Sequence, residues 1–435
     1  MLYERWREVV RDRPSEVALR ESSSERGWTF GQLDRQVEAL VTGASEWVCP
    51  QGNSADFVLA VLCGWRQGSV VCPLEPHDRP PSILLPPPRC RHLKTVATPN
   101  GALHAVAFTE AQLAADVENI VATMGLRPDW PNLGVISLAH SYGFSSLVLP
   151  LLLHGIPLIL VPSALPEAVR RAAQGHRKLT LPAVPALWRT WHAAGAIPPN
   201  IVLAISAGAP LPLALERAVF AAQGLKIHNF LGASECGGIS YDATPVPRED
   251  EACVGHLLKN VEAGVNADGV LVVRGRAVGE MYWPHPSETL GGRSFQTNDL
   301  AELKEGLVYL RGRDSDQINV AGRKIFPTVI EQALRQHPSV TECLVFGVPD
   351  ESAGRTDLIV ACVVPRQEGD AVQLRQFLLG KLPAWQVPRE WWFVKSLGAK
   401  TRGKVSRPEW RGKFLESRVL GSAERQCHPK AGGFR

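Results

Sequence analysis

The sequence contains no C-x-x-C pair and no other spacing of cysteine or histidine that is typical of a metal site. Its nine cysteines are an odd number, so we expect reduced thiols in a cytoplasmic protein rather than a disulfide framework. A strong excess of one charge is also missing. The net charge is only +4, and nucleic acid is therefore not an expected partner. The opening segment, MLYERWREVVRDRPSE, is amphipathic and lacks the apolar core of a signal peptide.

A long uninterrupted apolar run is absent as well. Residues 131–166 carry no acid, lysine or arginine, but Pro150, Gly155 and Pro157 divide them. The pieces are shorter than the ~20 residues that a helix needs to cross a bilayer. We therefore predict a buried helix over 145–154 and a buried strand over 157–161, and no membrane span.

What the sequence does have is enough chain for two or three domains with a large core, since it holds 435 residues of which 45% are hydrophobic. Residues 178–240 alternate between strand patterns (KLTLPA, NIVLAIS, LKIHNFL) and helix patterns. Such alternation predicts an α/β fold with a mostly parallel sheet. Ligands of these sheets bind at the carboxyl ends of the strands, where two turns of small residues fall.

A second informative stretch begins at Asp299, an isolated acid that precedes a predicted hairpin over 301–313. A charged, turn-prone joint follows the hairpin, and then an amphipathic helix that opens at Pro327. Asp299 can accept hydrogen bonds from a diol, and Arg313 can donate to a diol or a phosphate. The alternative interpretation is a surface hairpin with solvated charges in front of a linker.

The motifs FQTND (295–299) and GRDSDQINVAGRKIFP (312–327), with Ile330 and Glu331, resemble the adenylate-forming enzymes. That superfamily includes acyl- and aryl-CoA synthetases, adenylation domains of peptide synthetases and luciferases. The resemblance implies a large α/β body over 1–314, in which mixed, mostly parallel sheets are packed with helices beside a small β-unit. It also implies a small mobile α+β lid over 315–412. We expect residues 413–435 to form a basic, disordered tail.

The resemblance also implies roles for individual residues. Asp299 and Arg313 would fix the ribose, Ser234 would contact phosphate, and Glu235 would hold Mg²⁺ facing ATP. Lys404, in the segment LGAKTRGKVSR, matches the catalytic lysine. The further implied residues are Gly208, Ala209, Pro210, Asn229, Phe230, Leu231, Gly232, Ala233 and Gly101 at the nucleotide, His140, Ser206 and Gly237 at the substrate pocket, and Ser315 at the hinge.

The phosphate-binding loop departs from the family pattern. Gly101 is kept, but Thr98 replaces the first glycine, and most of the serine and threonine run is missing. Pro99 removes a backbone donor, and His104 stands where a lysine or arginine is usual. Leu231 also replaces an aromatic residue beside the adenine. We therefore expect a weaker grip on the β- and γ-phosphates of ATP.

The implied reaction is ATP- and Mg²⁺-dependent activation of an aryl or fatty acid, followed by transfer to the pantetheine thiol of CoA or of an acyl carrier protein. The alternative is a non-catalytic or half-reaction-only homologue that binds AMP or an acyl-adenylate. Some residues also have plainer interpretations. His140 can be a core-edge histidine satisfied by the backbone, Lys404 and Lys400 can be solvated charges, and Cys236 is expected to be inert. Ser315 replaces a charged pivot residue, so the hinge can be tuned differently.

Overall fold

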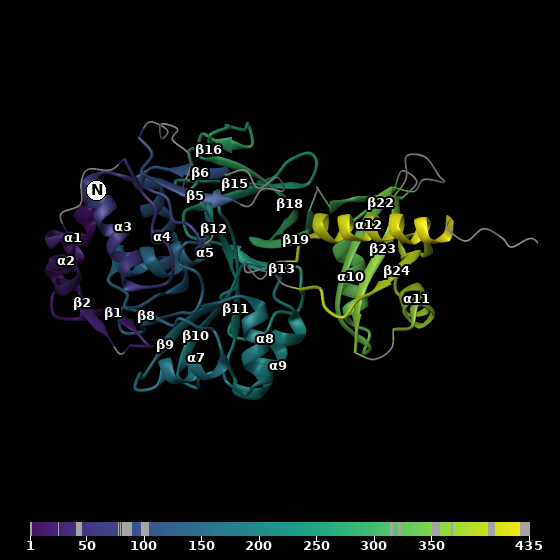
Figure 1. The fold of residues 1–435 in the computed structure, drawn as a ribbon, viewed down its shortest axis with the longest axis horizontal. Coiled ribbons are helices and arrows are strands. Elements are labelled where there is room, and N and C mark those ends of the chain that lie inside the picture. The colour runs from purple at the N-terminus through teal and green to yellow at the C-terminus, as the bar shows by residue number, and fades with distance from the viewer. Residues whose placement is uncertain are drawn as a thin grey trace, which may run out of the picture. The chain divides into compact units, whose positions relative to one another are not determined.

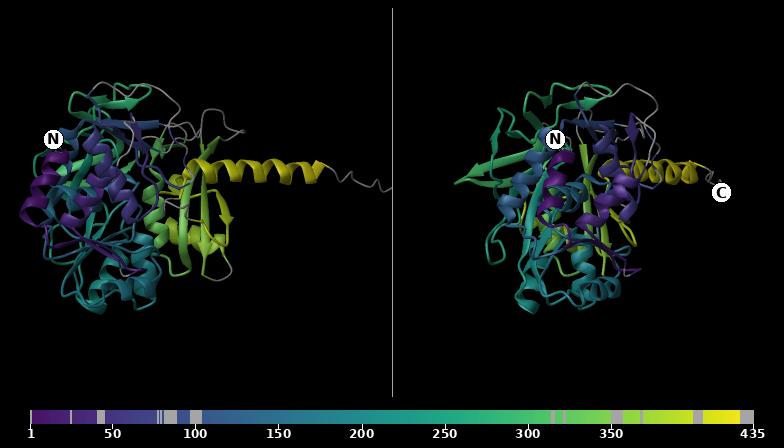
Figure 2. Two further views of the ribbon diagram at one scale, coloured as in Figure 1. Left: turned by 60° about the vertical axis from the view of Figure 1, so that its left-hand side comes forward. Right: turned by 90° about the vertical axis from the view of Figure 1, so that its left-hand side faces the viewer.

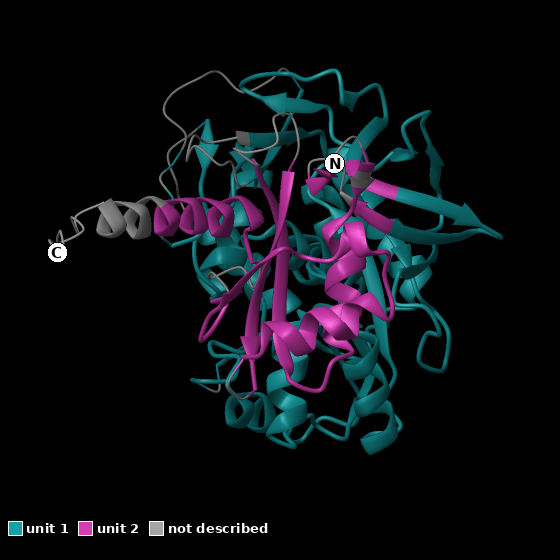
Figure 3. Cartoon of the chain, turned by 90° about the vertical axis from the view of Figure 1, so that its right-hand side faces the viewer, with its two compact units in different colours: residues 1–297, 301–310 teal, residues 298–300, 311–435 magenta. Residues whose placement is uncertain are grey.

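The computed structural model describes residues 2–24, 26–40, 46–76, 78, 80, 89–96, 104–313, 316–320, 323–349, 357–366, 369–398 and 405–426. The chain forms two compact units (Figure 3). The first contains residues 1–297 and 301–310, and the second contains residues 298–300 and 311–435. The expected boundary after residue 314 lies a few residues beyond this division.

The helices of the first unit are α1 (Leu2–Asp12), α2 (Phe30–Ala39), α3 (Ala55–Gln67), α4 (Glu110–Met124), α5 (Ser141–Gly143), the π-helix η1 (Phe144–Val148), α6 (Leu149–His154), α7 (Pro166–Ala173), α8 (Pro185–Ala193) and α9 (Leu213–Gln223). Its strands are β1 (Val17–Glu21), β2 (Gly27–Thr29), β3 (Trp47–Val48), β4 (Val70–Val71), β5 (His92–Val96), β6 (His104–Phe108), β7 (Asn132–Gly134), β8 (Leu158–Leu160), β9 (Leu179–Ala183), β10 (Ile201–Ser206), β11 (Ile227–Ala233), β12 (Gly237–Tyr241), β13 (Cys253–Leu257), β14 (Val261–Val265), β15 (Val270–Gly275), β16 (Met281–Trp283) and β17 (Leu290–Gly291). The hairpin strands β18 (Ser294–Lys304) and β19 (Leu307–Arg313) each contribute residues to both units.

One large mixed sheet organises the first unit. Its strand order is β14-β15-β18-β19-β13-β12-β11-β10-β9-β7-β8-β1-β2, with β17 beside β18. Neighbouring strands from β11 through to β1 are parallel, as the alternating strand and helix patterns predicted. The strands of the expected small β-unit are antiparallel and join the same sheet through β12 and β13. A smaller sheet has the order β16-β6-β5-β4-β3.

Local capping signals set where two helices begin. Thr29 caps α2 and Thr109 caps α4, each in a reciprocal capping box with the glutamine three residues later. The α4 helix ends at Gly125, whose left-handed backbone (φ 66°) suits glycine. The N-terminal helices α1, α2 and α3 lie side by side in Figures 1 and 2 and share the main hydrophobic core.

The apolar stretch over 131–166 folds as predicted into separate buried pieces. Helix α5, the π-helix η1 and α6 follow one another without a break, and β8 enters the large sheet. Pro150 lies inside this continuous helical run and cannot donate to the Ser146 carbonyl one turn earlier, which accepts a hydrogen bond from the Asn132 side chain over 3.4 Å instead. Among the described residues, no helix combines the length and the apolarity needed to cross a bilayer.

The second unit contains β20 (Ile318–Val320), β21 (Arg323–Ile325), α10 (Pro327–Arg335), β22 (Val340–Pro349), β23 (Asp357–Pro365), α11 (Ala371–Leu379), the 3₁₀ turn η3 (Ala384–Gln386), β24 (Glu390–Phe393) and α12 (Arg407–Gln426). Alternate residues of β22 and β23 belong to two different hydrophobic clusters. One cluster includes α10 and α11, and the other includes α12, so both faces of this small sheet are covered.

The prediction of a disordered tail from residue 413 is wrong for residues 413–426. Helix α12 continues to Gln426, and the apolar side chains of Trp410 and Phe414 near its start pack in a hydrophobic cluster of the second unit. Phe414 is buried and packs edge-on against Phe346, with ring centroids 5.9 Å apart, and it also contacts Trp392. The prediction was based on the basic composition of residues 413–435 and overlooked this apolar contact.

Candidate active site

The small-residue turn after β10 lies beside β11, which carries the second small-residue motif. Strand β10 ends at Ser206, which pairs in parallel register with Asn229 of β11. On the other side, Ser206 pairs with Ala183 at the end of β9. The chain then turns through Gly208, whose φ of 85° favours glycine. The predicted 206–210 turn therefore lies at the carboxyl end of β10, next to the start of the 229–235 motif in β11.

The Ser234–Glu235 turn joins β11 to β12 and is held from β16. The hydroxyl of Tyr282 donates a hydrogen bond to Glu235 Oε1 over 3.0 Å. The backbone N–H of Gly279 donates to the Glu235 carbonyl over 2.8 Å. Burial, together with the nearby Glu235 charge, raises the pKa of Tyr282, so the phenol stays protonated as a donor. These contacts fix the direction of the carboxylate.

The donor chemistry of this turn suits magnesium. Glu235 is half-buried, and its hydrogen bond to Tyr282 uses Oε1. Oε2 is the carboxylate oxygen left for a cation. Mg²⁺ is commonly held by one or two carboxylates together with substrate phosphates rather than by a full protein cage. In the described part of the chain, no group of three or more His, Cys, Asp or Glu side chains forms such a cage.

The predicted pocket residue His140 caps the short helix α5. Its Nδ1 accepts a hydrogen bond from the backbone N–H of Tyr142 over 3.2 Å, so in the neutral ring the proton is on Nε2. The ring of Tyr142 lies 6.0 Å from the ring of Phe230 on β11, measured between centroids. His140 is thus satisfied in part by the backbone, as its plainer interpretation expected. The ring contact between Tyr142 and Phe230 also connects the His140 segment to the β11 motif.

Asp299 and Arg313 lie on the hairpin strands β18 and β19. Glu305 and Gly306 join these strands with φ values of 51° and 79°, the signs of a tight type I′ hairpin turn. Asp299 is half-buried. The backbone of Arg313 is described, but its side chain lies outside the described residues, as do the whole of Gly101, Ser315 and Lys404.

Comparison with known proteins decides the family. Residues 95–289 match the family model described as AMP-binding enzyme, and residues 329–404 match the model of its C-terminal domain. The chain belongs to the AMP-binding enzymes. This is the adenylate-forming superfamily that the sequence motifs indicated.

Several curated relatives of this AMP-binding enzyme are ligases. It is 24% identical to a long-chain-fatty-acid–CoA ligase of Bacillus subtilis, over 71% of the chain and 59% of the relative. It is 31% identical to an anthranilate–CoA ligase of Pseudomonas aeruginosa, over 57% and 51%. A fatty acid–[acyl-carrier-protein] ligase of Streptomyces coeruleorubidus is 34% identical, over 31% and 26%. The chain therefore spans less than two thirds of the length of these relatives.

Solved structures of the superfamily have the same fold. ATP-bound MatB from Rhodopseudomonas palustris superposes with a TM-score of 0.84 at 20% identity and covers 96% of this chain and 99% of its own. The AMP complex of an O-succinylbenzoate coenzyme A synthetase from Bacillus subtilis gives 0.80 at 18% identity, over 93% and 97%. At these identities the likeness establishes the fold alone.

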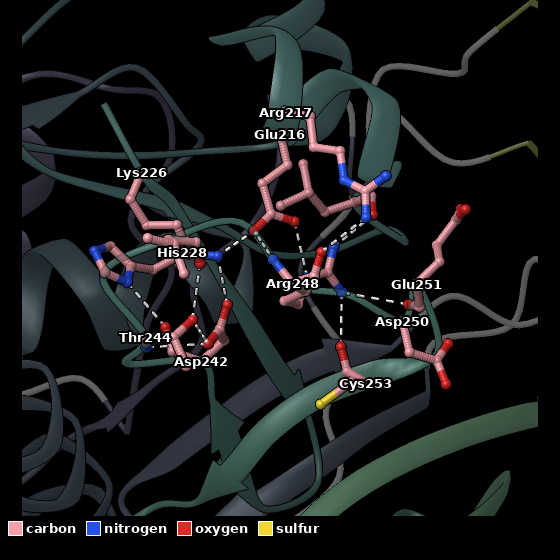
Figure 4. A network of polar contacts seen from close by, with 12 residues as sticks. Glu216, Arg217, Lys226, His228, Asp242, Thr244, Arg248, Asp250, Glu251 and Cys253 are labelled. Carbon is pink, nitrogen blue, oxygen red and sulfur yellow. Dashed lines mark hydrogen bonds and ion pairs between the residues drawn. The ribbon is translucent and has the colours of Figure 1, made fainter. Parts of the chain in front are cut away.

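The structure of this AMP-binding enzyme reveals a buried charge network that the sequence analysis missed (Figure 4). Lys226, just before β11, forms ion pairs with Glu216 of α9 and with Asp242 just after β12, the latter at 2.6 Å. Arg248 Nε pairs with the other Glu216 oxygen at 2.8 Å. Two acids and two bases balance within the core. They tie α9 to the open end of the antiparallel β11–β12 hairpin, the end opposite the Ser234–Glu235 turn.

A second buried cluster lies beneath the Glu235 turn and joins Lys94 of β5 to Asp116 of α4. The sequence offered a signal for it, because a lysine inside an apolar strand and an aspartate inside an apolar helix both demand partners. The pairing itself could not be deduced without the fold. Cys236, next to this cluster, is fully buried, and burial raises the pKa of its thiol, which agrees with the expected inert role.

Proposed function

We propose that this AMP-binding enzyme activates a carboxylic acid with ATP. A carboxylate oxygen attacks the α-phosphorus, pyrophosphate leaves, and an acyl-adenylate forms. A thiol then attacks the acyl carbon and AMP departs with the acid's oxygen. The observation that carries the proposal is the Glu235 carboxylate, which Tyr282 fixes in the turn after β11, the strand whose residue Asn229 pairs with Ser206.

The chemical problem is that two anions must meet, so the site has to supply positive charge at the reacting atoms. Magnesium, when bound, supplies charge to the leaving phosphates. In this chain Glu235 would hold it, and the Ser234 hydroxyl would contact phosphate. We assign the adenine and acyl floor to the turn over 206–210 and the motif over 229–233, and the pocket to His140 with Gly237.

The C-terminal unit supplies the remaining assignments. Asp299 and Arg313 would fix the ribose, which is a positioning role. Lys404 would contact the carboxylate and the α-phosphate when this unit closes as a lid. A rotation about Ser315 would then remove Lys404 and admit the pantetheine thiol. These roles are inferred from the sequence motifs in which the residues occur.

The thiol acceptor in this proposal is CoA or an acyl carrier protein. Relatives named for each acceptor match the chain, as do relatives named for a long-chain fatty acid and for anthranilate. We accordingly propose an aryl or fatty acid as the substrate. A cytoplasmic location is part of the proposal because the described cysteines are all free thiols.

One sequence feature favours a second candidate function. The segment from Val96 to His104 lacks most of the hydroxyl side chains expected of a phosphate-binding loop, and Pro99 cannot donate a backbone hydrogen bond. A protein that binds AMP or an acyl-adenylate without cleaving ATP would need no grip on the β- and γ-phosphates. In this second candidate function the protein binds AMP or an acyl-adenylate at the same site but does not catalyse the reaction.

The test is carboxylate-dependent release of pyrophosphate from ATP and Mg²⁺, measured against a panel of aryl and fatty acids. Release that Lys404→Ala abolishes supports the enzyme. The matched control is Lys400→Ala, which removes a cation four residues earlier in the same segment and should retain release. No release with any acid, combined with tight binding of AMP, would favour the second candidate.

A further inference from the structure

A buried ion pair lies in the core of the first unit. Lys94 Nζ is 3.3 Å from Asp116 Oδ2, and the two side chains are only 2% and 1% exposed. The hydroxyl of Ser145 donates to the same carboxylate oxygen over 2.6 Å and lies 3.1 Å from Lys94 Nζ. The ammonium also lies over the ring of Phe108, 4.7 Å from its centroid. Both charges are therefore compensated locally.

The second oxygen of Asp116 points at the strand that follows the Glu235 turn. Asp116 Oδ1 accepts a hydrogen bond from the backbone N–H of Gly238 over 3.1 Å. Gly237, immediately before, has a φ of 71°, and a Cβ added there would stand 2.0 Å from the same oxygen. The carboxylate thus packs directly against the backbone of this turn and leaves room only for glycine.

Stability alone explains this arrangement poorly. Removing two charges from water is expensive, and a hydrophobic pair of similar volume is often at least as stable as a buried ion pair. What the cluster achieves is a connection between segments. It joins β5, which leads into the predicted phosphate-binding loop, to η1, which follows the His140 segment, and to β12, which follows Glu235.

We infer that Asp116 is a positioning residue for Glu235, and that Lys94 and Ser145 hold the Asp116 carboxylate in the orientation that reaches Gly238. The inference rests on the proposed function where it assigns Glu235 to a cation. Its structural part, that Asp116 holds the start of β12 in place, stands without any turnover. The Asp116 carboxylate of α4 accepts from Gly238, and Tyr282 of β16 donates to Glu235, so the turn is held by hydrogen bonds from two separate elements.

The test compares two variants that both remove the buried charges together. Lys94→Met with Asp116→Asn keeps an amide oxygen that can accept from Gly238 N–H. Lys94→Met with Asp116→Ala removes that acceptor. We expect hydrogen exchange at the Gly238 amide to be about tenfold faster in the alanine pair than in the asparagine pair. We also expect the alanine pair to need a severalfold higher Mg²⁺ concentration than the asparagine pair for half-maximal pyrophosphate release.

A control separates this effect from a general loosening of the core. Ile120→Ala opens a cavity on the same helix, α4, and should leave the Mg²⁺ dependence at the wild-type value. Equal exchange at Gly238 in the two charge-free pairs would overturn the inference, as would faster exchange with an identical Mg²⁺ dependence. If the wild-type protein releases no pyrophosphate, the proposed function fails separately. Binding of ATP with and without Mg²⁺, measured by calorimetry, then replaces the activity readout.

Discussion

At the scale of single residues, the Glu235 carboxylate is the best-defined part of the candidate site. Its partner Tyr282 lies 47 residues away in sequence on β16, and that strand is anchored by pairing with β6. The Tyr282 hydroxyl therefore connects the turn proposed to bind the metal to the strand that follows the predicted phosphate-binding loop. Such a bond to a charged acceptor is stronger than a neutral one.

The Tyr282→Phe variant tests this link. Without its donor, the Glu235 carboxylate becomes free to rotate, so we expect the apparent affinity for Mg²⁺ with ATP to fall about threefold to tenfold, in line with the ~0.5–1.5 kcal/mol of a typical hydrogen bond. The measurement is a Mg²⁺ titration of pyrophosphate release. Tyr3→Phe, in α1, is the control for loss of a hydroxyl elsewhere. A Tyr282→Phe titration that coincides with the wild-type curve would remove Tyr282 from the site.

The ribose assignment of Asp299 gives a second prediction. Replacing Asp299 with alanine should weaken AMP binding by ~1–3 kcal/mol, because the ribose hydroxyls would lose their acceptor in a desolvated site. Calorimetric titration with AMP measures the change. Asp268→Ala, at an exposed turn residue, should bind AMP normally. Unchanged affinity in Asp299→Ala would show that the ribose binds elsewhere.

His92 on β5 yields a prediction about pH. The ring is fully buried, and within the described residues neither ring nitrogen has a hydrogen-bond partner. Burial, and to a lesser degree the Lys94 charge, holds the pKa of His92 well below its usual range. Below pH ~6.5 this histidine binds a proton in the unfolded chain but stays neutral in the folded protein. As the pH is lowered below that value, the free energy of unfolding should therefore fall by up to ~1.4 kcal/mol per pH unit because of His92.

The check is urea unfolding at pH values from 8 to 5 for the wild type and for His92→Phe. The phenylalanine variant keeps the ring contact with Phe144, whose centroid lies 4.4 Å from that of His92. We expect its unfolding free energy to depend less steeply on pH below 6.5 than that of the wild type. Identical slopes would mean that His92 is protonated in the folded protein.

At the scale of elements, the charge network around Lys226 sets the position of β11. Lys226→Met would leave the Glu216 and Asp242 carboxylates in the core without their shared cation. Breaking a buried pair in this way usually costs ~3–5 kcal/mol. Chemical denaturation should show that loss. Lys178→Met changes the exposed lysine just before β9 and should cost less than about 1 kcal/mol. A mild effect at Lys226 would indicate that the network contributes little to the position of β11.

The sequence was most informative about elements with local signals. The predicted hairpin over 301–313, with its Glu305–Gly306 turn, and the helix α10 that opens at Pro327 depend on residues a few positions apart. Pairings between distant residues could not be predicted. Lys94 and Asp116 are 22 residues apart, and their contact depends on how β5 and α4 pack. The buried face of α12 was missed for the same reason.

At the scale of the whole molecule, two strand ends in the first unit carry the assigned adenine, phosphate and metal contacts, and the second unit carries the assigned ribose and lysine residues. The motifs anticipated the family and the fold because they occur in both units. The substrate acid was not predictable, because the residues assigned to its pocket are contributed singly by separate segments such as α5 and β12.

The central claim is that a carboxylate oxygen of the substrate becomes bonded to the α-phosphorus of ATP. The most direct measurement supplies an accepted acid labelled with ¹⁸O in its carboxylate, together with ATP, Mg²⁺ and a pantetheine thiol, and weighs the AMP produced by mass spectrometry. The account predicts that each AMP carries one ¹⁸O atom taken from the acid. Thioester formed alongside unlabelled AMP, or no AMP with any acid, would contradict it.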